Sequence, residues 1–183
     1  MARLGGGSGL RLGMPGASGG LAYMKGKEAV EAELNRQLEG IKVRSVGGMI
    51  KAAKFIRAQT EATPPLTPVD YGNLRASWFV TTATAIRVGK GVSKFRGPKA
   101  AEIASNHEKG TAQAMGEVAK MTTKDKKFVM LGYSTNYSGF VHEYIGETRF
   151  KRAGAEAKWL ETHIKRNTKK IVEIVKEDAQ IKR

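Results

Sequence analysis

The stretch TPVDYGNLRASW, at residues 67–78, lies where a helical pattern gives way to a strand pattern. Pro68 fixes its own φ and disfavours helical geometry at Thr67, so any helix before this stretch must end upstream of it. Asp70 can accept hydrogen bonds from backbone N–H groups about two residues ahead, and Gly72 can adopt the positive φ that such a turn often needs. The stretch therefore predicts a tight turn between two elements.

After the turn, side chains alternate between two faces with a period of two residues. One face is apolar throughout and consists of Leu74, Ala76, Trp78 and Val80. The other face is mixed and consists of Arg75, Ser77, Phe79 and Thr81. We therefore expect a strand that begins at Leu74 and packs its apolar face on the core.

Upstream of the turn, the sequence predicts a flexible arm followed by helix. Residues 1–26 contain nine glycines, and such a segment cannot bury enough apolar area to offset the entropy lost on ordering. From Lys27 onwards apolar residues recur at helical spacing, which places them on one face. They are Val30, Leu34, Leu38 and Ile41, then Val46, Met49, Ile50, Ala53 and Ile56. The Gly47-Gly48 pair leaves open whether this region is one kinked helix or two, and Thr63-Pro64-Pro65 ends it.

Downstream of the turn, the sequence predicts a small sheet with one interruption. Residues 81–88 are rich in β-branched side chains and lead to a turn at residues 89–91, and residues 127–135 predict a third main strand. Residues 97–127 have loosely helical spacing and predict an insertion with one or two short helices. Such an insertion could carry a partner-specific surface without disturbing the core.

The last part of the chain predicts helices that close the fold. Aromatic residues recur at helical spacing within residues 137–144, so we expect them to seal the sheet. A C-terminal helix is expected from about residue 155 to residue 179, with Trp159 at the start of its core face. The predicted class is α+β, as a single domain over residues 27–183. It has a long N-terminal helix, a small mainly antiparallel sheet and a C-terminal helix packed on the sheet.

The net charge of +15 is the main compositional feature. The excess is spread along the chain and is densest, at +6, over residues 149–183. A spread positive field favours a polyanionic neighbour, of which DNA is the usual one, and a solvated basic surface without a nucleic-acid site is the alternative. The local cluster that could contact DNA or a protein partner lies on the C-terminal helix. It consists of Lys165, Arg166, Lys169, Lys170 and Lys176.

No catalytic, cofactor or metal site is predicted. The chain has no cysteine, and its three histidines lie in different segments without the spacing of metal ligands. Asp70 and Glu143 could act as the paired carboxylates of a small hydrolase, but a turn cap at Asp70 and an ion pair between Glu143 and Arg75 explain them more simply. We therefore expect an Arg75–Glu143 pair and no enzymatic activity. The apolar runs are too short to span a bilayer and the start lacks the hydrophobic stretch of a secretory signal, so no membrane contact is expected.

A second stretch, NYSGFVHEY at residues 136–144, gives the turn a more specific meaning. A Pro-Val-Asp-x-Gly turn and Leu-Arg-x-Ser, followed some sixty residues later by this Tyr/Glu segment, resemble the neck and tail-component family of tailed bacteriophages. The resemblance covers roughly residues 29–178. It departs from the family pattern at Tyr71, where Thr is usual, after Glu143, and in residues 97–127. The residues that carry the motif are Pro68, Asp70, Gly72, Leu74, Arg75, Ser77, Tyr137, Glu143 and Trp159.

The resemblance implies a structural virion protein that joins the DNA-filled head to the tail. The family implies a homo-oligomeric ring, a hexamer or dodecamer, between head-closure or adaptor proteins and tail-tube proteins, as a tail-completion or tail-terminator-like component. Its subunits would surround the DNA channel with transient, non-specific DNA contact. The expected location is the virion, with the host cytoplasm during assembly. The alternative is a basic nucleic-acid-binding protein that docks duplex DNA through its C-terminal Lys/Arg helix.

Overall fold

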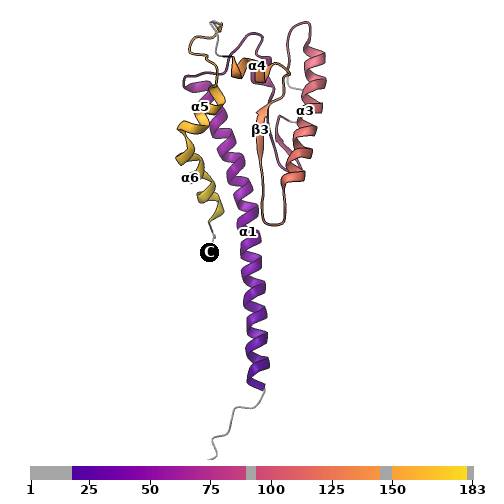
Figure 1. Ribbon diagram of the computed structural model, residues 1–183, viewed down its shortest axis with the longest axis vertical. Helices are drawn as coiled ribbons and strands as arrows, with labels where there is room; N and C mark the ends of the chain where they lie inside the picture. The colour runs from indigo at the N-terminus through magenta and orange to yellow at the C-terminus, as the bar shows by residue number, and fades with distance from the viewer. Residues whose placement is uncertain (1–17, 90–93, 145–149, 181–183) are drawn as a thin grey trace, which may run out of the picture. The chain divides into compact units, whose positions relative to one another are not determined.

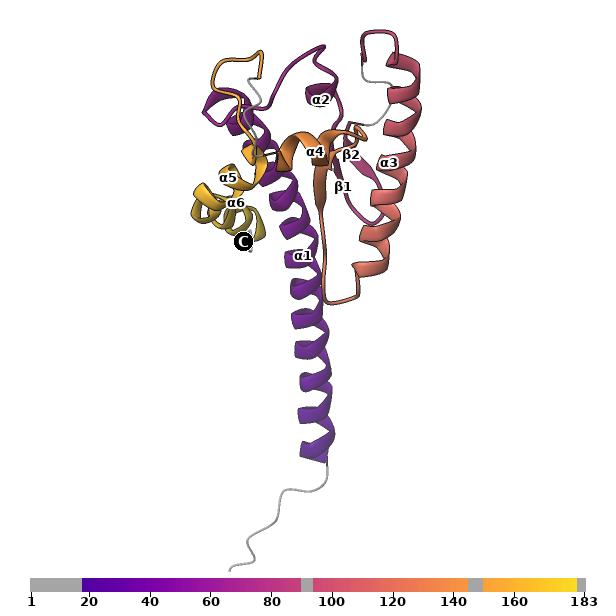
Figure 2. The ribbon, with the colours of Figure 1, turned by 45° about the horizontal axis from the view of Figure 1, so that its top comes forward.

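The computed structural model describes residues 18–89, 94–144 and 150–180, with side chains described from residue 27 onwards within these ranges. The chain divides into two compact units, residues 1–39 and 40–183. The larger unit combines helices with a three-stranded antiparallel sheet, which confirms the α+β class (Figures 1 and 2). Among the described residues, no helix is both long and apolar enough to cross a membrane.

Helix α1 (Ser18–Ala62) is longer than predicted and is a single helix. It begins nine residues before the expected start at Lys27, so residues 18–26 of the expected flexible arm are helical. Once a helix exists, each added residue costs only its own propensity, about 1 kcal/mol for glycine, and no new nucleus. The rest of the arm, residues 1–17, lies outside the described residues. The helix ends at Ala62, where the Thr63-Pro64-Pro65 stop was predicted.

The sheet consists of β1 (Trp78–Thr81), β2 (Ile86–Val88) and β3 (Met130–Tyr133), in the order β2-β1-β3. Both pairs are antiparallel. All four residues of the central strand β1 are buried. Trp78 and Val80 form the core with Ala53 of α1. The opposite face of the sheet is covered by α3 (Ala100–Met121), as Figures 1 and 2 show.

The predicted strand start at Leu74 is wrong. Residues Asn73–Ala76 form a short helix, α2, which follows directly on Gly72. Gly72 has a φ of 85°, as predicted, and this left-handed residue turns the chain into the helical step. The backbone N–H of Ser77 then donates to the Asn73 carbonyl at 2.9 Å, and the strand begins one residue later. Leu74 belongs to the predicted apolar face and Ser77 to the predicted mixed face, and both are buried. The alternation of residue types therefore does not correspond to a strand with one buried face.

The segment expected to be an insertion with one or two short helices contains one helix of 22 residues, α3. Its buried residues recur at spacings of three and four, and they are His107, Thr111, Ala114 and Val118. His107 also links two segments, because its Nδ1 lies 2.5 Å from Ser134 Oγ and its Nε2 lies 2.7 Å from the Gly89 carbonyl oxygen. Residues 97–127 therefore supply one layer of the core.

The predicted single C-terminal helix is two helices, α5 (Trp159–Arg166) and α6 (Thr168–Ala179). They separate at Asn167, whose side-chain amide donates to the His163 carbonyl at 2.9 Å. A local bond of this kind competes with the helix ladder. Helix α5 reaches the sheet, since the ring of the buried Trp159 lies 5.9 Å from that of Tyr133. Helix α6 packs on α1 instead, as Figure 1 shows.

The approach of α6 to α1 explains the Gly47-Gly48 pair, which does not interrupt α1. A Cβ atom on Gly48 would lie 2.8 Å from the Val175 Cα atom of α6. Lys51 of α1 and Asp178 of α6 form an ion pair with an Nζ–Oδ1 distance of 2.5 Å at the same contact. Glycine is therefore required at residue 48 for close helix packing rather than for a kink.

Candidate functional site

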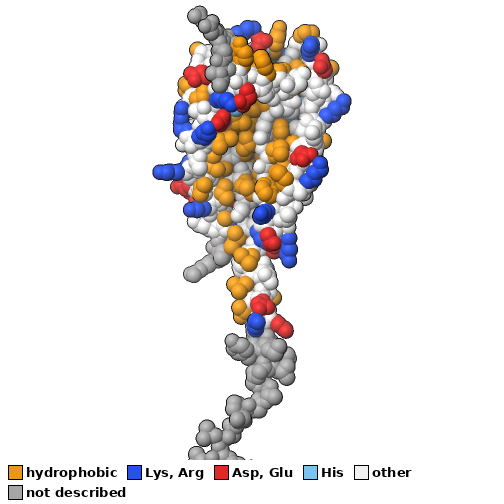
Figure 3. All heavy atoms as spheres, in the orientation of Figure 1, with side chains coloured by type: hydrophobic (Ala, Val, Ile, Leu, Met, Phe, Trp, Pro, Cys, Tyr) orange, Lys and Arg blue, Asp and Glu red, His pale blue; other side chains and the backbone are white. Residues whose placement is uncertain are grey.

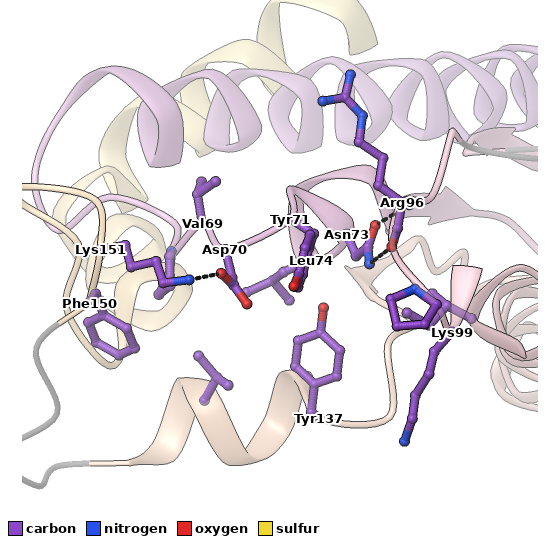
Figure 4. A pocket seen from close by; sticks show the side chains of 14 residues that line it. Val69, Asp70, Tyr71, Asn73, Leu74, Arg96, Lys99, Tyr137, Phe150 and Lys151 are labelled. Atoms are coloured by element: carbon purple, nitrogen blue, oxygen red, sulfur yellow. Dashed lines mark hydrogen bonds and ion pairs between the residues drawn. The ribbon is translucent and has the colours of Figure 1, made fainter.

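The turn at residues 67–74 forms one wall of a cavity of about 560 Å³ (Figure 4). The other walls come from α4 (Ser138–Glu143), the start of α3 and residues 150–151. We call this cavity the turn pocket. Its apolar walls include Val69, Leu74, Ile103, Tyr137, Val141 and Phe150. Segments that are distant in sequence thus meet where the two motif stretches lie side by side.

Of the two motif residues in the second stretch, Tyr137 lines the turn pocket and Glu143 does not. The Tyr137 hydroxyl points toward Tyr71 and Leu74 in Figure 4, and all three side chains line the pocket. Partial burial of the Tyr137 phenol raises its pKa, and the nearby Asp70 carboxylate adds to the rise. The aromatic residues of this segment do not seal the sheet, contrary to expectation, because Tyr137, Phe140 and Tyr144 are all exposed.

The rim of the turn pocket is mostly basic. Arg96, Lys99 and Lys151 line it together with one carboxylate, that of Asp70. Lys151 Nζ donates to Asp70 (Figure 4), and this hydrogen bond raises the pKa of Lys151. The Arg96 and Lys99 side chains form no ion pair within the described ranges. The charged side chains that line the pocket are therefore mostly basic, and those of Arg96 and Lys99 extend outward from its apolar centre (Figure 4).

The expected turn cap at Asp70 is wrong, because its carboxylate binds Lys151 and no backbone N–H of the described residues. Asn73 closes this region instead. Its side-chain amide donates to the Arg96 carbonyl, and the Arg96 backbone N–H donates to Asn73 Oδ1, both at 2.8 Å (Figure 4). Sequence reasoning missed Asn73, although the bidentate amide of a buried asparagine is a common means of joining two loops.

The expected ion pair between Arg75 and Glu143 is also wrong. Arg75 Nε lies 2.7 Å from the carboxylate of Glu61, near the end of α1. Arg57 and Arg152 bind the same carboxylate at 2.5 Å and 2.8 Å. This Glu61 cluster joins α1, α2 and the segment before α5. The spacing of Arg57 and Glu61, four residues apart on a helix, was the only signal of it in the sequence.

Glu143 is an exposed surface residue at the end of α4. Its carboxylate accepts a hydrogen bond from Lys158 Nζ, which lowers the pKa of Glu143, and lies 2.7 Å from His142 Nδ1. Asp70 and Glu143 therefore hold different lysines, in different places, and do not form a carboxylate pair. Pro68 and Trp159, the remaining motif residues, are buried and support the fold.

The five basic residues of the C-terminal region are all exposed, on α5 and α6. Lys165 pairs with Glu161, Lys170 pairs with Glu173 at 2.8 Å, and Arg166 donates to the Pro64 carbonyl at 2.9 Å. Acidic side chains are thus interleaved with the basic ones, which lowers the positive potential that DNA would meet. Two of the five residues of the predicted basic cluster, Lys165 and Lys170, are therefore paired with acidic neighbours.

Within residues 27–89, 94–144 and 150–180, no three or more His, Asp or Glu side chains gather as a metal site would require. His163 Nε2 lies 3.0 Å and 3.1 Å from the carbonyl oxygens of Thr63 and Pro65, so this side chain joins α5 to the segment that follows α1. Comparison with known proteins gives no relative: no family model, no curated protein and no solved structure matches the chain. Function must therefore be inferred from the chain's own residues.

Proposed function

We propose that this protein is a structural component of a tailed-phage virion, which forms a homo-oligomeric ring in the neck between head and tail. The observation that carries the proposal is an apolar face on the N-terminal part of α1. Val30, Leu34 and Leu38 are 60%, 57% and 52% exposed, although their spacing is that of a core stripe. Figure 3 shows hydrophobic side chains at the surface of this part of the helix. An apolar face of this kind is typical of a surface that another chain covers.

The two motif stretches support the same proposal, since they meet at the turn pocket. Four of the nine motif residues, Pro68, Asp70, Leu74 and Tyr137, line this pocket, and Tyr71 lines it beside them. The carboxylates of Asp70 and Glu143 each bind a lysine, which favours structural roles for both. The more specific role of a tail-completion or tail-terminator-like ring is proposed from the resemblance alone.

The competing function is a nucleic-acid binder that uses Lys165, Lys169 and Lys176. A protein that makes six to ten phosphate contacts should lose about 10³–10⁵ in DNA affinity between 50 and 200 mM salt. The interleaved acids on α5 and α6 favour weak contact instead, as a channel wall requires if DNA is to slide past it. We therefore expect weak binding of duplex DNA by the isolated subunit near physiological salt.

The test combines sizing, negative-stain images and a salt titration of DNA binding. The wild type is compared with a triple variant, Lys165→Glu, Lys169→Glu and Lys176→Glu. A matched control reverses three exposed lysines elsewhere: Lys54, Lys109 and Lys126. Ring-shaped particles and weak DNA binding are expected. Tight, steeply salt-dependent binding that only the first variant abolishes, with unchanged particle size, would replace the ring by the nucleic-acid binder.

A further inference from the structure

We infer that the ring is built head to tail: residues 27–39 of α1 in one copy, here called the acidic helix segment, dock into the turn pocket of a second copy. The inference rests on the proposed ring and names the two surfaces that join its subunits. The occupant of the pocket is a second copy of this chain. Two observations carry it, the complementary charge of the surfaces and the complementary distribution of apolar side chains.

The acidic helix segment differs in charge from the rest of the molecule. It contains two basic and four acidic residues, a net charge of −2, whereas residues 40–183 contain 27 basic and 13 acidic residues, a net charge of +14. Arg36 is held within the helix by Glu33, through two nitrogen–oxygen contacts of 2.8 Å. This bond lowers the pKa of Glu33 to about 2, so its carboxylate stays charged at any pH of interest. The exposed leucines of the segment thus lie among acidic side chains.

The charged residues of the turn pocket are mostly basic, opposite in sign to the acidic helix segment. The centre of the pocket is apolar, like the exposed leucines of that segment. Arg96, Lys99 and Lys151 give three positive charges against the single carboxylate of Asp70, a net charge of +2. Its volume of about 560 Å³ is sufficient for two or three aliphatic side chains of the size of leucine. Leucines spaced four residues apart on one helix can enter such a pocket together, as in other helix-in-groove contacts.

The two surfaces are different, so the contact they make is heterologous. A heterologous contact leaves one surface of each kind unused in a dimer, and repetition either closes a ring or extends as a filament. Pairing of the acidic helix segment with itself would place like charges together. The glycine-rich residues 1–26 carry three basic and no acidic residues, so they fit the basic rim poorly.

The test uses two association-defective variants and their mixture. Leu34→Glu alters the acidic helix segment, with Ala32→Glu as a control that makes the same charge change at another exposed position. Arg96→Glu with Lys99→Glu alters the pocket rim, with Lys109→Glu and Lys120→Glu as the control on exposed positions of α3. Sedimentation analysis of the full chain should show self-association weakened by roughly 30-fold or more in each test variant, the effect of losing one central contact, and little change in the controls.

Mixing the two test variants should restore one intact interface, because each retains the surface that the other lacks. The mixture should therefore form dimers and no larger particles. Assemblies that withstand both test variants would overturn the inference and leave the ring intact. A wild type that stays monomeric at every concentration would overturn the inference and the ring together.

A cross-linking experiment tests the contact without relying on affinity. The chain has no cysteine, so Leu34→Cys and Tyr71→Cys each introduce a single thiol at an exposed site. Oxidation of the mixture should give a disulfide-linked dimer of one chain of each kind. A dimer from Leu34→Cys alone, with none from the mixture, would show that the acidic helix segments pair with each other, and would refute docking in the turn pocket.

Discussion

Replacement of Glu61 by Gln should destabilise the protein more than any other single loss of a charge described above. The carboxylate of Glu61 is the shared partner of Arg57, Arg75 and Arg152. Two of these arginines also hold the backbone, since Arg57 donates to the Arg75 carbonyl and Arg152 donates to the carbonyls of Glu61 and Thr67. Removal of the carboxylate leaves three guanidinium groups close together with no anion between them.

The magnitude follows from how far the cluster is buried. The side chain of Glu61 is 19% exposed, and those of Arg57 and Arg152 are 20% and 23% exposed. Breaking a fully buried pair costs about 3–5 kcal/mol, and a surface pair contributes less than about 1 kcal/mol. For this intermediate site we expect a loss of about 2–3 kcal/mol in the free energy of unfolding. In a chain of this size such a loss lowers the Tm by about 5–10 °C.

The assay is thermal and urea unfolding of Glu61→Gln beside Glu117→Gln. Glu117 pairs with Lys120 at 2.9 Å on α3, with both side chains largely exposed, so its replacement should cost less than about 1 kcal/mol. Equal Tm values for the two variants would refute the view that the Glu61 cluster joins α1, α2 and the segment before α5.

Three further predictions concern single positions. Gly72→Ala should lower the free energy of unfolding by about 1–2 kcal/mol and Gly72→Asn by less, because residue 72 has a φ of 85° and a Cβ there would meet no atom within 4 Å. Urea unfolding measures both variants, and equal losses would contradict a conformational cause. Gly48→Ala should lower the Tm and speed amide exchange in α6, because a Cβ atom there would collide with Val175. Gly116→Ala, at an exposed position in the middle of α3, should instead stabilise the protein by about 0.5–1 kcal/mol. A Gly48→Ala variant that is more stable than the wild type would disprove the close approach of α6 to α1. Glu143→Gln should have a small effect on the Tm at pH 7 and a smaller one at pH 3. Lys158 lowers the pKa of Glu143 below its ordinary value of 4.5, so the stabilisation is present above that value and is lost as the pH falls; the same difference at both pH values would argue against the pair.

The sequence predicted those parts of the fold that depend on local chemistry. The stop at Thr63-Pro64-Pro65 and the positive φ of Gly72 follow from backbone sterics, and the structure has both. The third strand follows from alternation at residues 127–135 and is observed as Met130–Tyr133. The α+β class follows from the order of these signals along the chain.

Features that depend on tertiary contact were predicted less well. Arg75 could be given a partner only by choosing among the acids of the two motif stretches, and the true partner, Glu61, lies outside both. Residues 97–127 have weak periodicity because two buried residues of α3, His107 and Thr111, are polar and hydrogen-bonded. The stripe at Val30, Leu34 and Leu38 has the spacing of a core face, and periodicity cannot tell a face covered by the same chain from one left exposed.

The contact between α6 and the glycine pair of α1 sets the time at which the fold can be completed. Lys51 and Asp178 are 127 residues apart in the sequence. The surface of α1 on which α6 packs is therefore translated long before α6. At about 5–20 residues per second, the interval is on the order of 6–25 s on the ribosome. During that interval the glycine face of α1 is open to other chains. Any assembly that needs α6 in place must therefore wait until α6 has been translated and has left the ribosome.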